Sequence, residues 1–163
     1  MLNKTLIAEL QYEAGVTRKL LERVPEKKFD YKPHEKSMTL NALSIHLAEI
    51  PAWIGPTVES DDMDFGTMEY KLPVVNTTAG LLKLLDDSVK SGVEALNKAD
   101  DANLTGVWTA KNKGDIVFEM PRIQVIRGMI FNHLYHHRGQ LTVYLRMLDV
   151  ALPQVYGPTA DEQ

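Results

Sequence analysis

Hydrophobic residues recur at spacings of three and four along most of the chain, which is the pattern of amphipathic helices. The pattern first covers residues 6–24, and Pro25 directly behind it closes the predicted helix, because proline cannot continue the backbone hydrogen-bond ladder. A second apolar face covers residues 40–54 and contains Pro51, where we expect a kink or an earlier stop. The first third of the chain therefore predicts two helices.

The middle of the chain alternates between a loop and another helix. An acidic stretch rich in turn-forming residues, 59–76, predicts a surface loop. A third apolar face over residues 81–96 predicts a helix, for which Thr77 or Thr78 supplies the capping oxygen.

Between the third helix and the last one the hydrophobic period changes. Two short runs, Val107–Thr109 and Ile116–Phe118, flank the turn-rich segment Lys111–Asp115 and predict a β-hairpin. Two strands alone are marginally stable, so this hairpin must pack on something. The longest apolar stripe begins behind Pro121 and predicts a last helix that runs to about Asp149.

Amphipathic helices of this length make an all-α four-helix bundle the economical architecture, with a small β-hairpin between helices 3 and 4. A chain of 163 residues is of a size typical of one domain, so residues 1–163 are expected to form a single unit. The first two helices can be antiparallel neighbours, and the long loop before the third permits a crossover that leaves the second and third parallel. The hydrophobic pattern alone does not choose the topology.

Composition narrows the function classes. The chain has 18 Lys and Arg against 22 Asp and Glu, and a net charge of −4 argues against a broad basic face for nucleic acid or an anionic membrane surface. No run approaches the roughly 18 apolar residues of a membrane span, and the first residues lack an apolar signal segment, so we expect a cytoplasmic protein. Without cysteine, the chain supplies neither a thiolate ligand nor a thiol nucleophile.

Three of the five histidines, His133, His136 and His137, fall together on the last predicted helix. At about 100° per residue, His137 lies in the middle of the apolar face and His133 at its edge, whereas His136 points away. An i, i+4 pair suits two ligands of one metal ion, although buried histidines held by hydrogen bonds are the simpler interpretation. Leu134 follows His133 where a zincin protease has glutamate, which excludes that class.

His46 strengthens the metal interpretation. It lies at the edge of the apolar stripe of the second predicted helix, so it completes a three-histidine site with His133 and His137 if the two helices are neighbours. Three neutral imidazoles with an open position are typical of a catalytic centre rather than a closed structural one. Such ligands suit Zn²⁺, Ni²⁺, Co²⁺ or Fe²⁺ and do not choose among them.

Several segments resemble the DinB-like family of DNA-damage-inducible, YfiT-related proteins. The His-Arg-Gly-Gln run together with the upstream histidine is fairly specific, and the segment near the end of the chain adds independent support. The matching segments are Lys32–Leu40, Ile45–Trp53, Asn132–Leu141 and Leu152–Glu162.

The resemblance implies a four-helix bundle of up-down-down-up topology, with the second and third helices parallel, often as a homodimer. It also implies a divalent metal, zinc or nickel first and iron, cobalt or manganese next, at positions that correspond to His46, His133 and His137. Relatives with assigned activities are mostly thiol S-transferases of detoxification or stress response, which use a low-molecular-weight thiol such as bacillithiol or mycothiol. Others look like metal-dependent hydrolases.

Three functions stay open at this point. The protein is a transferase in which the metal activates a thiol, a hydrolase in which water replaces the thiol, or a metal-binding stress protein without turnover. The expected partners are a small-molecule substrate and the thiol, with no nucleic acid and no membrane. Glu49, one turn after His46, is the candidate catalytic residue, and a solvated helix position is the alternative.

The remaining candidate residues are expected to have structural rather than chemical roles. We expect His34 to be exposed in its loop, and Arg138 and Gln140 to lie on the helix surface or at a dimer contact. Three aromatic residues are expected to serve packing, with a pocket wall as the alternative: Trp53, Trp108 and Tyr135.

Overall fold

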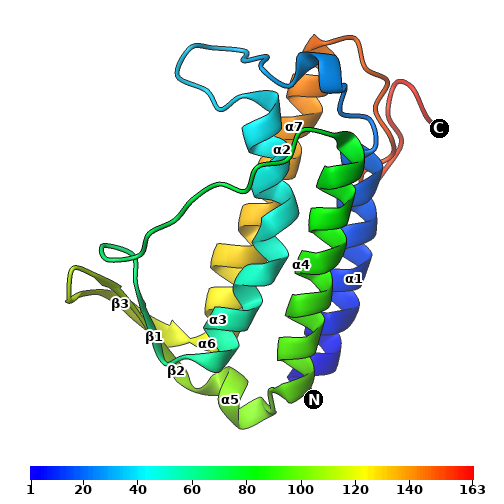
Figure 1. Ribbon diagram of the computed structural model, residues 1–163. Coiled ribbons are helices and arrows are strands. Elements are labelled where there is room, and N and C mark those ends of the chain that lie inside the picture. The colour runs from blue at the N-terminus through cyan, green and yellow to red at the C-terminus, as the bar shows by residue number, and fades with distance from the viewer.

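The computed structural model describes all residues, 1–163, and places the four longest helices side by side (Figure 1). They are α1 (Leu2–Leu21), α2 (Leu40–Glu49), α4 (Thr78–Lys98) and α7 (Asn132–Met147). Helices α2 and α4 run in the same direction, and α1 and α7 run opposite to both (Figure 1). The expectation that the second and third long helices lie parallel agrees with this arrangement.

The core consists of the apolar faces that the periodicity predicted. Each of the four long helices contributes fully or almost fully buried leucines, among them Leu10, Leu43, Leu85 and Leu141. Burying one such side chain stabilises the fold by roughly 1.5–3 kcal/mol. Threonine hydroxyls cap two of these helices: Thr39 accepts from the Ala42 amide and Thr77 from the Gly80 amide, each at 3.0 Å. No helix is both long enough and apolar enough to cross a membrane.

The second helical segment bends at Pro51, as the sequence predicts. Helix α2 passes into a 3-10 turn, η2 (Ile50–Trp53), and then into α3 (Ile54–Glu59). Helix α4 packs closely against this bend, because a Cβ at Gly92 would lie only 2.7 Å from the Pro51 carbonyl oxygen. The bend brings the Trp53 indole to 5.4 Å from the His46 imidazole, measured between ring centroids.

The last helical segment changes its winding before the histidine cluster. Helix α6 (Arg122–Val125) leads into a π turn, η3 (Ile126–Phe131), which passes directly into α7. π turns are rare and occur frequently at functional sites. The sequence predicts one uninterrupted helix here, and the wide turn is not visible in the hydrophobic period.

Three short strands form a sheet beside the helices: β1 (Asp62–Asp64), β2 (Val107–Asn112) and β3 (Asp115–Pro121). Strands β2 and β3 pair antiparallel, which confirms the predicted hairpin, and β1 adds to β2 in parallel. The expectation of a plain loop over residues 59–76 is therefore wrong at β1. The Asp64 carboxylate fixes this strand by accepting the Lys113 and Gly114 amides of the hairpin turn, both at 2.8 Å.

The simple picture of four helices and a hairpin is too coarse. A 3-10 turn, η1 (Glu26–Lys28), lies in the first connection, and α5 (Asp101–Thr105) links α4 to the sheet. The pattern also did not predict α3, α6 and β1 as separate elements. The fold as a whole is mainly helical with a small three-stranded sheet.

Arg138 corrects another expectation, because its side chain is only 1% exposed instead of lying on the helix surface. Its guanidinium donates to the Glu13 carboxylate of α1 at 2.6 Å and also contacts the Tyr156 hydroxyl. A buried charge needs such partners, since an unpaired one is strongly destabilising. Arg138 therefore ties α7 to α1 and to the segment that follows α7.

Candidate metal centre

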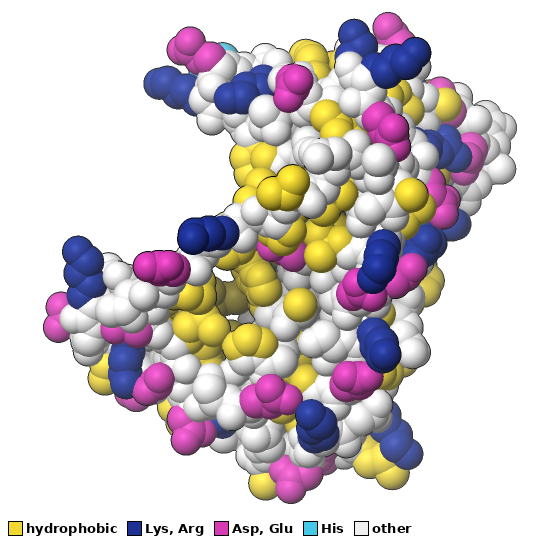
Figure 2. All heavy atoms as spheres, viewed as in Figure 1, with side chains coloured by type: hydrophobic (Ala, Val, Ile, Leu, Met, Phe, Trp, Pro, Cys, Tyr) yellow, Lys and Arg dark blue, Asp and Glu magenta, His cyan; other side chains and the backbone are white.

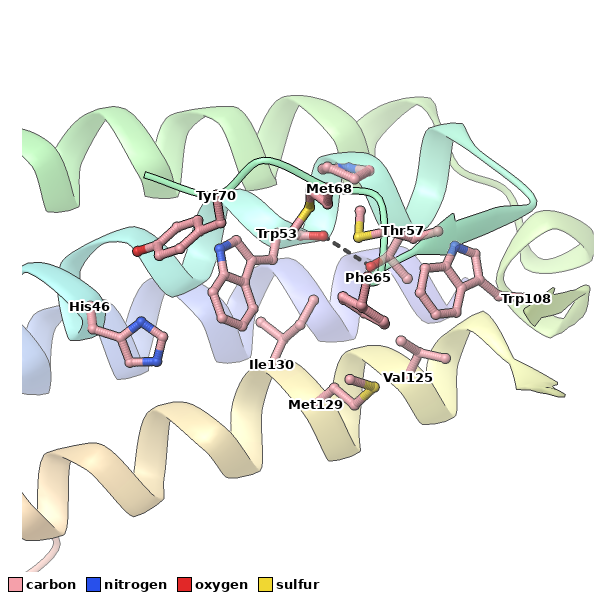
Figure 3. A pocket seen from close by; sticks show the side chains of 12 residues that line it. His46, Trp53, Thr57, Phe65, Met68, Tyr70, Trp108, Val125, Met129 and Ile130 are labelled. Atoms are coloured by element: carbon pink, nitrogen blue, oxygen red, sulfur yellow. Dashed lines mark hydrogen bonds between the residues drawn. The ribbon is translucent and has the colours of Figure 1, made fainter. Parts of the chain in front are cut away.

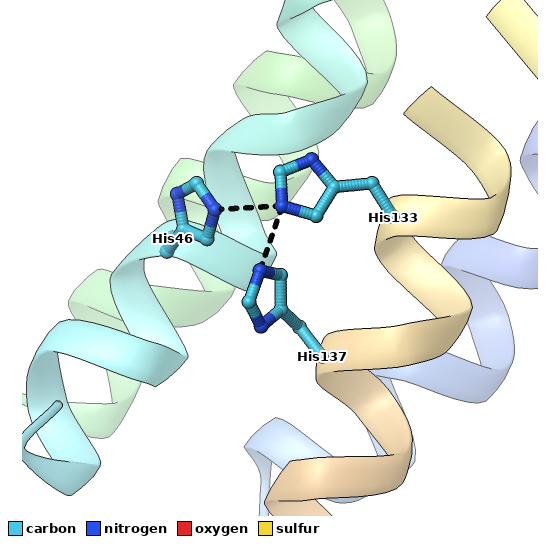
Figure 4. A group of neighbouring side chains, drawn as sticks. All are labelled: His46, His133 and His137. Carbon is cyan, nitrogen blue, oxygen red and sulfur yellow. Dashed lines mark hydrogen bonds between the residues drawn. The ribbon is translucent and has the colours of Figure 1, made fainter. Parts of the chain in front are cut away.

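His46 of α2 and the pair His133 and His137 of α7 turn their imidazoles toward one another (Figure 4). The Nε2 atoms of His46 and His133 lie 3.3 Å apart, and those of His133 and His137 lie 2.7 Å apart. One ligand nitrogen from each ring falls within 4.8 Å of the other two. Zinc–imidazole bonds measure about 2.0–2.1 Å, so the three histidines are positioned to bind one metal ion.

Two of the three imidazoles are held from their other side by side-chain oxygens. His46 Nδ1 lies 2.9 Å from Glu49 Oε1, and His137 Nδ1 lies 2.7 Å from Gln140 Oε1. A carboxylate or amide oxygen accepts hydrogen bonds, so both Nδ1 atoms carry the proton and both Nε2 atoms present a lone pair. Lone pairs that converge without a donor between them fit a cation, and outer partners of this kind orient metal-bound histidines.

Burial keeps His133 and His137 in the neutral form that binds metal. Desolvation lowers the pKa of His137 to about 4, with the hydrogen bond to Gln140 in opposition and the nearby imidazoles reinforcing the shift. Desolvation likewise lowers the pKa of His133, and the His46 imidazole adds to the effect. Neutral rings at physiological pH leave the Nε2 lone pairs free for a cation.

The structure excludes the solvated alternative for Glu49, and it places Gln140 differently from the expectation. Glu49 is 7% exposed rather than solvated, and its carboxylate also accepts a hydrogen bond from the Tyr70 hydroxyl. Gln140 contacts His137 rather than serving only the helix surface. Gln140 follows His137 by three residues, as Glu49 follows His46, and this repeated i, i+3 spacing is the signal in the sequence that could have identified Gln140.

A cavity of about 410 Å³ adjoins the histidines and reaches from His46 to Trp108 of β2 (Figure 3). The bend after α2 supplies one wall, and η3 with the end of α6 supplies another through Val125, Met129 and Ile130. In the space-filling view, hydrophobic side chains surround a hollow on this face of the molecule (Figure 2). The volume lies in the range of small-molecule sites.

Residues 62–76, which we call the strap, close the cavity. The strap contributes Met63, Phe65, Met68 and Tyr70 to the lining. No backbone–backbone hydrogen bond involves residues 68–76. Apart from apolar contacts, this part is tied by Tyr70 to Glu49 and by the Val75 carbonyl, which accepts from the Asn41 amide at 2.8 Å.

A model of the DinB family matches residues 1–163, the whole length of the chain. The chain belongs to the DinB family. Among curated proteins, it is similar to the uncharacterized protein YrdA of Bacillus subtilis, with 26% identity over 152 residues that cover 93% of this chain and 86% of YrdA. The family resemblance inferred from the histidine segments is therefore confirmed.

Solved structures show the same DinB-like fold. A DinB-like protein of Bacillus subtilis, YjoA, aligns with a TM-score of 0.71 and 17% identity over 98% of this chain and 99% of its own. A DinB-like protein of Bacillus cereus aligns with a TM-score of 0.69 and 24% identity over 94% of this chain and 97% of its own. At these identities the likeness concerns the fold.

The other candidate residues lie outside the histidine cluster of this DinB-family chain. His34 and His136 are exposed, as expected, and neither belongs to the group of converging ligands. Tyr135 donates to the Glu9 carboxylate of α1 at 2.7 Å, away from the cavity. Trp53 and Trp108 both line the cavity, so the pocket-wall alternative holds for these two.

Proposed function

We propose that this DinB-family protein is a divalent-metal-dependent enzyme, a thiol S-transferase that acts on small molecules in detoxification or stress response. The observation that carries the proposal is the convergence of three imidazole Nε2 atoms beside an apolar cavity. His46, His133 and His137 would hold the metal, and zinc or nickel suits their nitrogen ligands. The substrate would occupy the cavity.

The chain's own residues prepare the site. Glu49 and Gln140 fix the ring orientation and the tautomer of two ligands, while the backbone of Met129 holds the third ring, that of His133. A bound divalent cation supplies Lewis acidity, which favours the thiolate form of a cosubstrate thiol at neutral pH. The sulfur then forms a bond to an electrophilic carbon of the substrate, and the leaving group keeps the electron pair of the broken bond.

The state of Glu49 supports transfer over hydrolysis. A hydrolytic site of the zincin kind needs a carboxylate that is free to take a proton from water. The Glu49 carboxylate already accepts from His46 and Tyr70, and no acidic residue lines the cavity. A thiol beside a divalent cation would release its proton to water at neutral pH and so would need no such base. Hydrolysis and metal binding without turnover are the alternatives that the experiments separate.

Metal content tests the foundation of the proposal. Protein purified without chelator and without nickel affinity should contain a stoichiometric divalent metal in elemental analysis. His137→Ala should lose it, because two imidazoles hold a cation far more weakly than three. His136→Ala is the matched control, since His136 is the exposed neighbour on the same helix and should leave the metal content unchanged. Full retention of metal in His137→Ala would contradict the assignment.

A thiol titration tests the transferase. In cobalt-substituted protein, a low-molecular-weight thiol of the bacillithiol or mycothiol type should change the visible spectrum, and its S-methylated form should not. Turnover of an activated ester without any response to thiols would favour the hydrolase. Bound metal with no response to thiol, ester or electrophile would favour a binding protein.

A further inference from the structure

The cavity beside the histidines carries no charged side chain. Its lining consists of aromatic, thioether and aliphatic groups together with His46, Thr57 and Tyr70, and it includes no Lys, Arg, Asp or Glu. The hydroxyl protons of Thr57 and Tyr70 already form hydrogen bonds within the protein. Thr57 donates to the Trp53 carbonyl at 2.9 Å, and Tyr70 donates to Glu49. Apart from a metal held by the histidines, a ligand in this cavity therefore meets no cation in the lining.

A charged ligand group would lose its hydration in such a place without compensation, which is costly for a carboxylate or an ammonium. The Glu49 carboxylate contacts His46 and Tyr70 of the lining, and its negative charge disfavours an anion further. The Trp108 indole carries a buried N–H without a partner. A neutral dipole of this kind does not neutralise a carboxylate.

The shape and chemistry of the walls favour flat apolar groups. Trp53, Phe65 and Trp108 present ring surfaces, and the thioethers of Met68 and Met129 lie among them (Figure 3). Met63 also lines the cavity. Aromatic edges and faces pack well with ligand rings, and methionine sulfur adapts to aromatic contacts. A cavity of about 410 Å³ can hold one substituted ring system.

We infer that the substrate is an uncharged molecule that carries an aromatic ring, and that the strap selects against ligands with a carboxylate in the cavity. The inference rests on the proposed function for the reacting group near His46, but the charge preference is a property of the cavity alone.

Intrinsic fluorescence reports directly on this cavity, because the chain has only two tryptophans and both line it. Three probes share one frame and differ in charge: para-bromobenzyl alcohol, para-bromobenzoate and para-bromobenzylammonium, whose bromine quenches a nearby indole. Titration of the full-length protein in EDTA at neutral pH should show the alcohol binding at least about tenfold more tightly than either ion. Because EDTA removes any metal, failure of the metal proposal leaves this ranking unchanged.

Substitutions in the strap test whether its residues determine the charge preference of the cavity. Met68→Arg places a cation at the cavity, and since Met68 is 47% exposed the fold should tolerate it. The preference for the alcohol over the benzoate should then fall by roughly tenfold. Val74→Arg is the matched control, because Val74 is 88% exposed on the same strap and does not line the cavity. Its preference should equal that of the unmodified protein.

Three results would overturn the inference. They are benzoate binding as tightly as the alcohol, absence of quenching by all three probes, and an equal response of Met68→Arg and Val74→Arg. Trp53→Phe and Trp108→Phe each retain one indole. Each variant should retain part of the quenching, because both indoles line the cavity.

Discussion

Tyr70 donates a hydrogen bond to Glu49 and thereby connects the strap to the candidate metal centre. Glu49 in turn holds Nδ1 of His46 at 2.9 Å, so one carboxylate serves both the closure of the cavity and the orientation of a ligand. Desolvation and the hydrogen bond to Glu49 raise the pKa of the Tyr70 hydroxyl, which keeps the phenol protonated as the donor. The position of the strap and the geometry of the centre are therefore coupled through a single side chain.

Tyr70→Phe should loosen the strap while the helices stay intact. Tyr70 is 50% exposed, so its hydrogen bond contributes about 0.5–1.5 kcal/mol, and residues 68–76 have no backbone–backbone hydrogen bonds to replace it. Trypsin should cleave after the exposed Lys71 about three- to tenfold faster than in the unmodified protein. Cleavage of the two urea-unfolded chains at equal rates is the control, and equal rates in the folded state would show that the contact does not restrain the strap.

Glu49→Gln should weaken metal binding without abolishing it. The amide oxygen can still accept from His46 Nδ1, but the negative charge that raises the basicity of the ring is lost. Outer partners of metal-bound histidines contribute about 10- to 100-fold in affinity, and we expect about a tenfold loss in competition with a zinc chelator. Glu59→Gln removes the same charge from an exposed site on α3 and should leave the affinity unchanged. Equal losses would point to a general effect of net charge.

The unfolding free energy of the metal-free protein should fall as the pH drops from about 6.5 to about 4. The pKa of His137 is lowered to about 4 in the folded state, whereas an unfolded chain binds the proton near 6.5. Between these values the unfolded state holds more protons, so acid favours unfolding. The loss should be on the order of 2–3 kcal/mol, at about 1.4 kcal/mol per pKa unit.

Urea unfolding at several pH values in EDTA measures this slope. His137→Gln should flatten it, and His34→Gln, at an exposed position, should not. A slope that is identical in the unmodified protein and in His137→Gln would assign the acid sensitivity to the carboxylates instead.

Two helical glycines should respond to alanine in opposite directions. At Gly139 nothing lies within 4 Å of the added Cβ, so Gly139→Ala should stabilise α7 by about 0.5–1 kcal/mol. At Gly92 the added Cβ would lie 2.7 Å from the Pro51 carbonyl oxygen and 3.2 Å from the Leu10 side chain, so α4 must move. Gly92→Ala should destabilise the fold by about 1–3 kcal/mol. Thermal or urea unfolding measures both, and a stabilised Gly92→Ala would disprove the close approach at the bend.

The helices and the histidine cluster could be predicted from the sequence because both follow local periods. The 3.6-residue period locates the buried faces, and the same geometry assigns His133 and His137 to the core side of one helix. His46 lies 87 positions before His133, and its role required the assumption that α2 and α7 are neighbours. The structure brings these rings together, while their role as metal ligands stays a prediction.

The features that the sequence did not predict depend on distant partners. Strand β1 forms because Asp64 accepts amides some fifty positions later in the chain, and three residues carry no periodic signal. Arg138 is buried because Glu13 of α1 and Tyr156 lie beside it. The contact of Tyr70 with Glu49 depends on how the strap folds back across the helices. A charged side chain is buried only where a partner compensates its charge, and the local sequence does not reveal a partner that is distant along the chain.

The π turn η3 lies between the histidines of α7 and part of the cavity wall. A π turn closes its hydrogen bonds over five residues instead of four, so it accommodates one residue more than a regular α-helical path. Deletion of a single residue within it would rotate Val125 by about 100° relative to His133 while the imidazoles keep their own spacing. Insertions and deletions within η3 would therefore change the shape of the cavity, and with it the ligands that fit, without changing the spacing of the histidines.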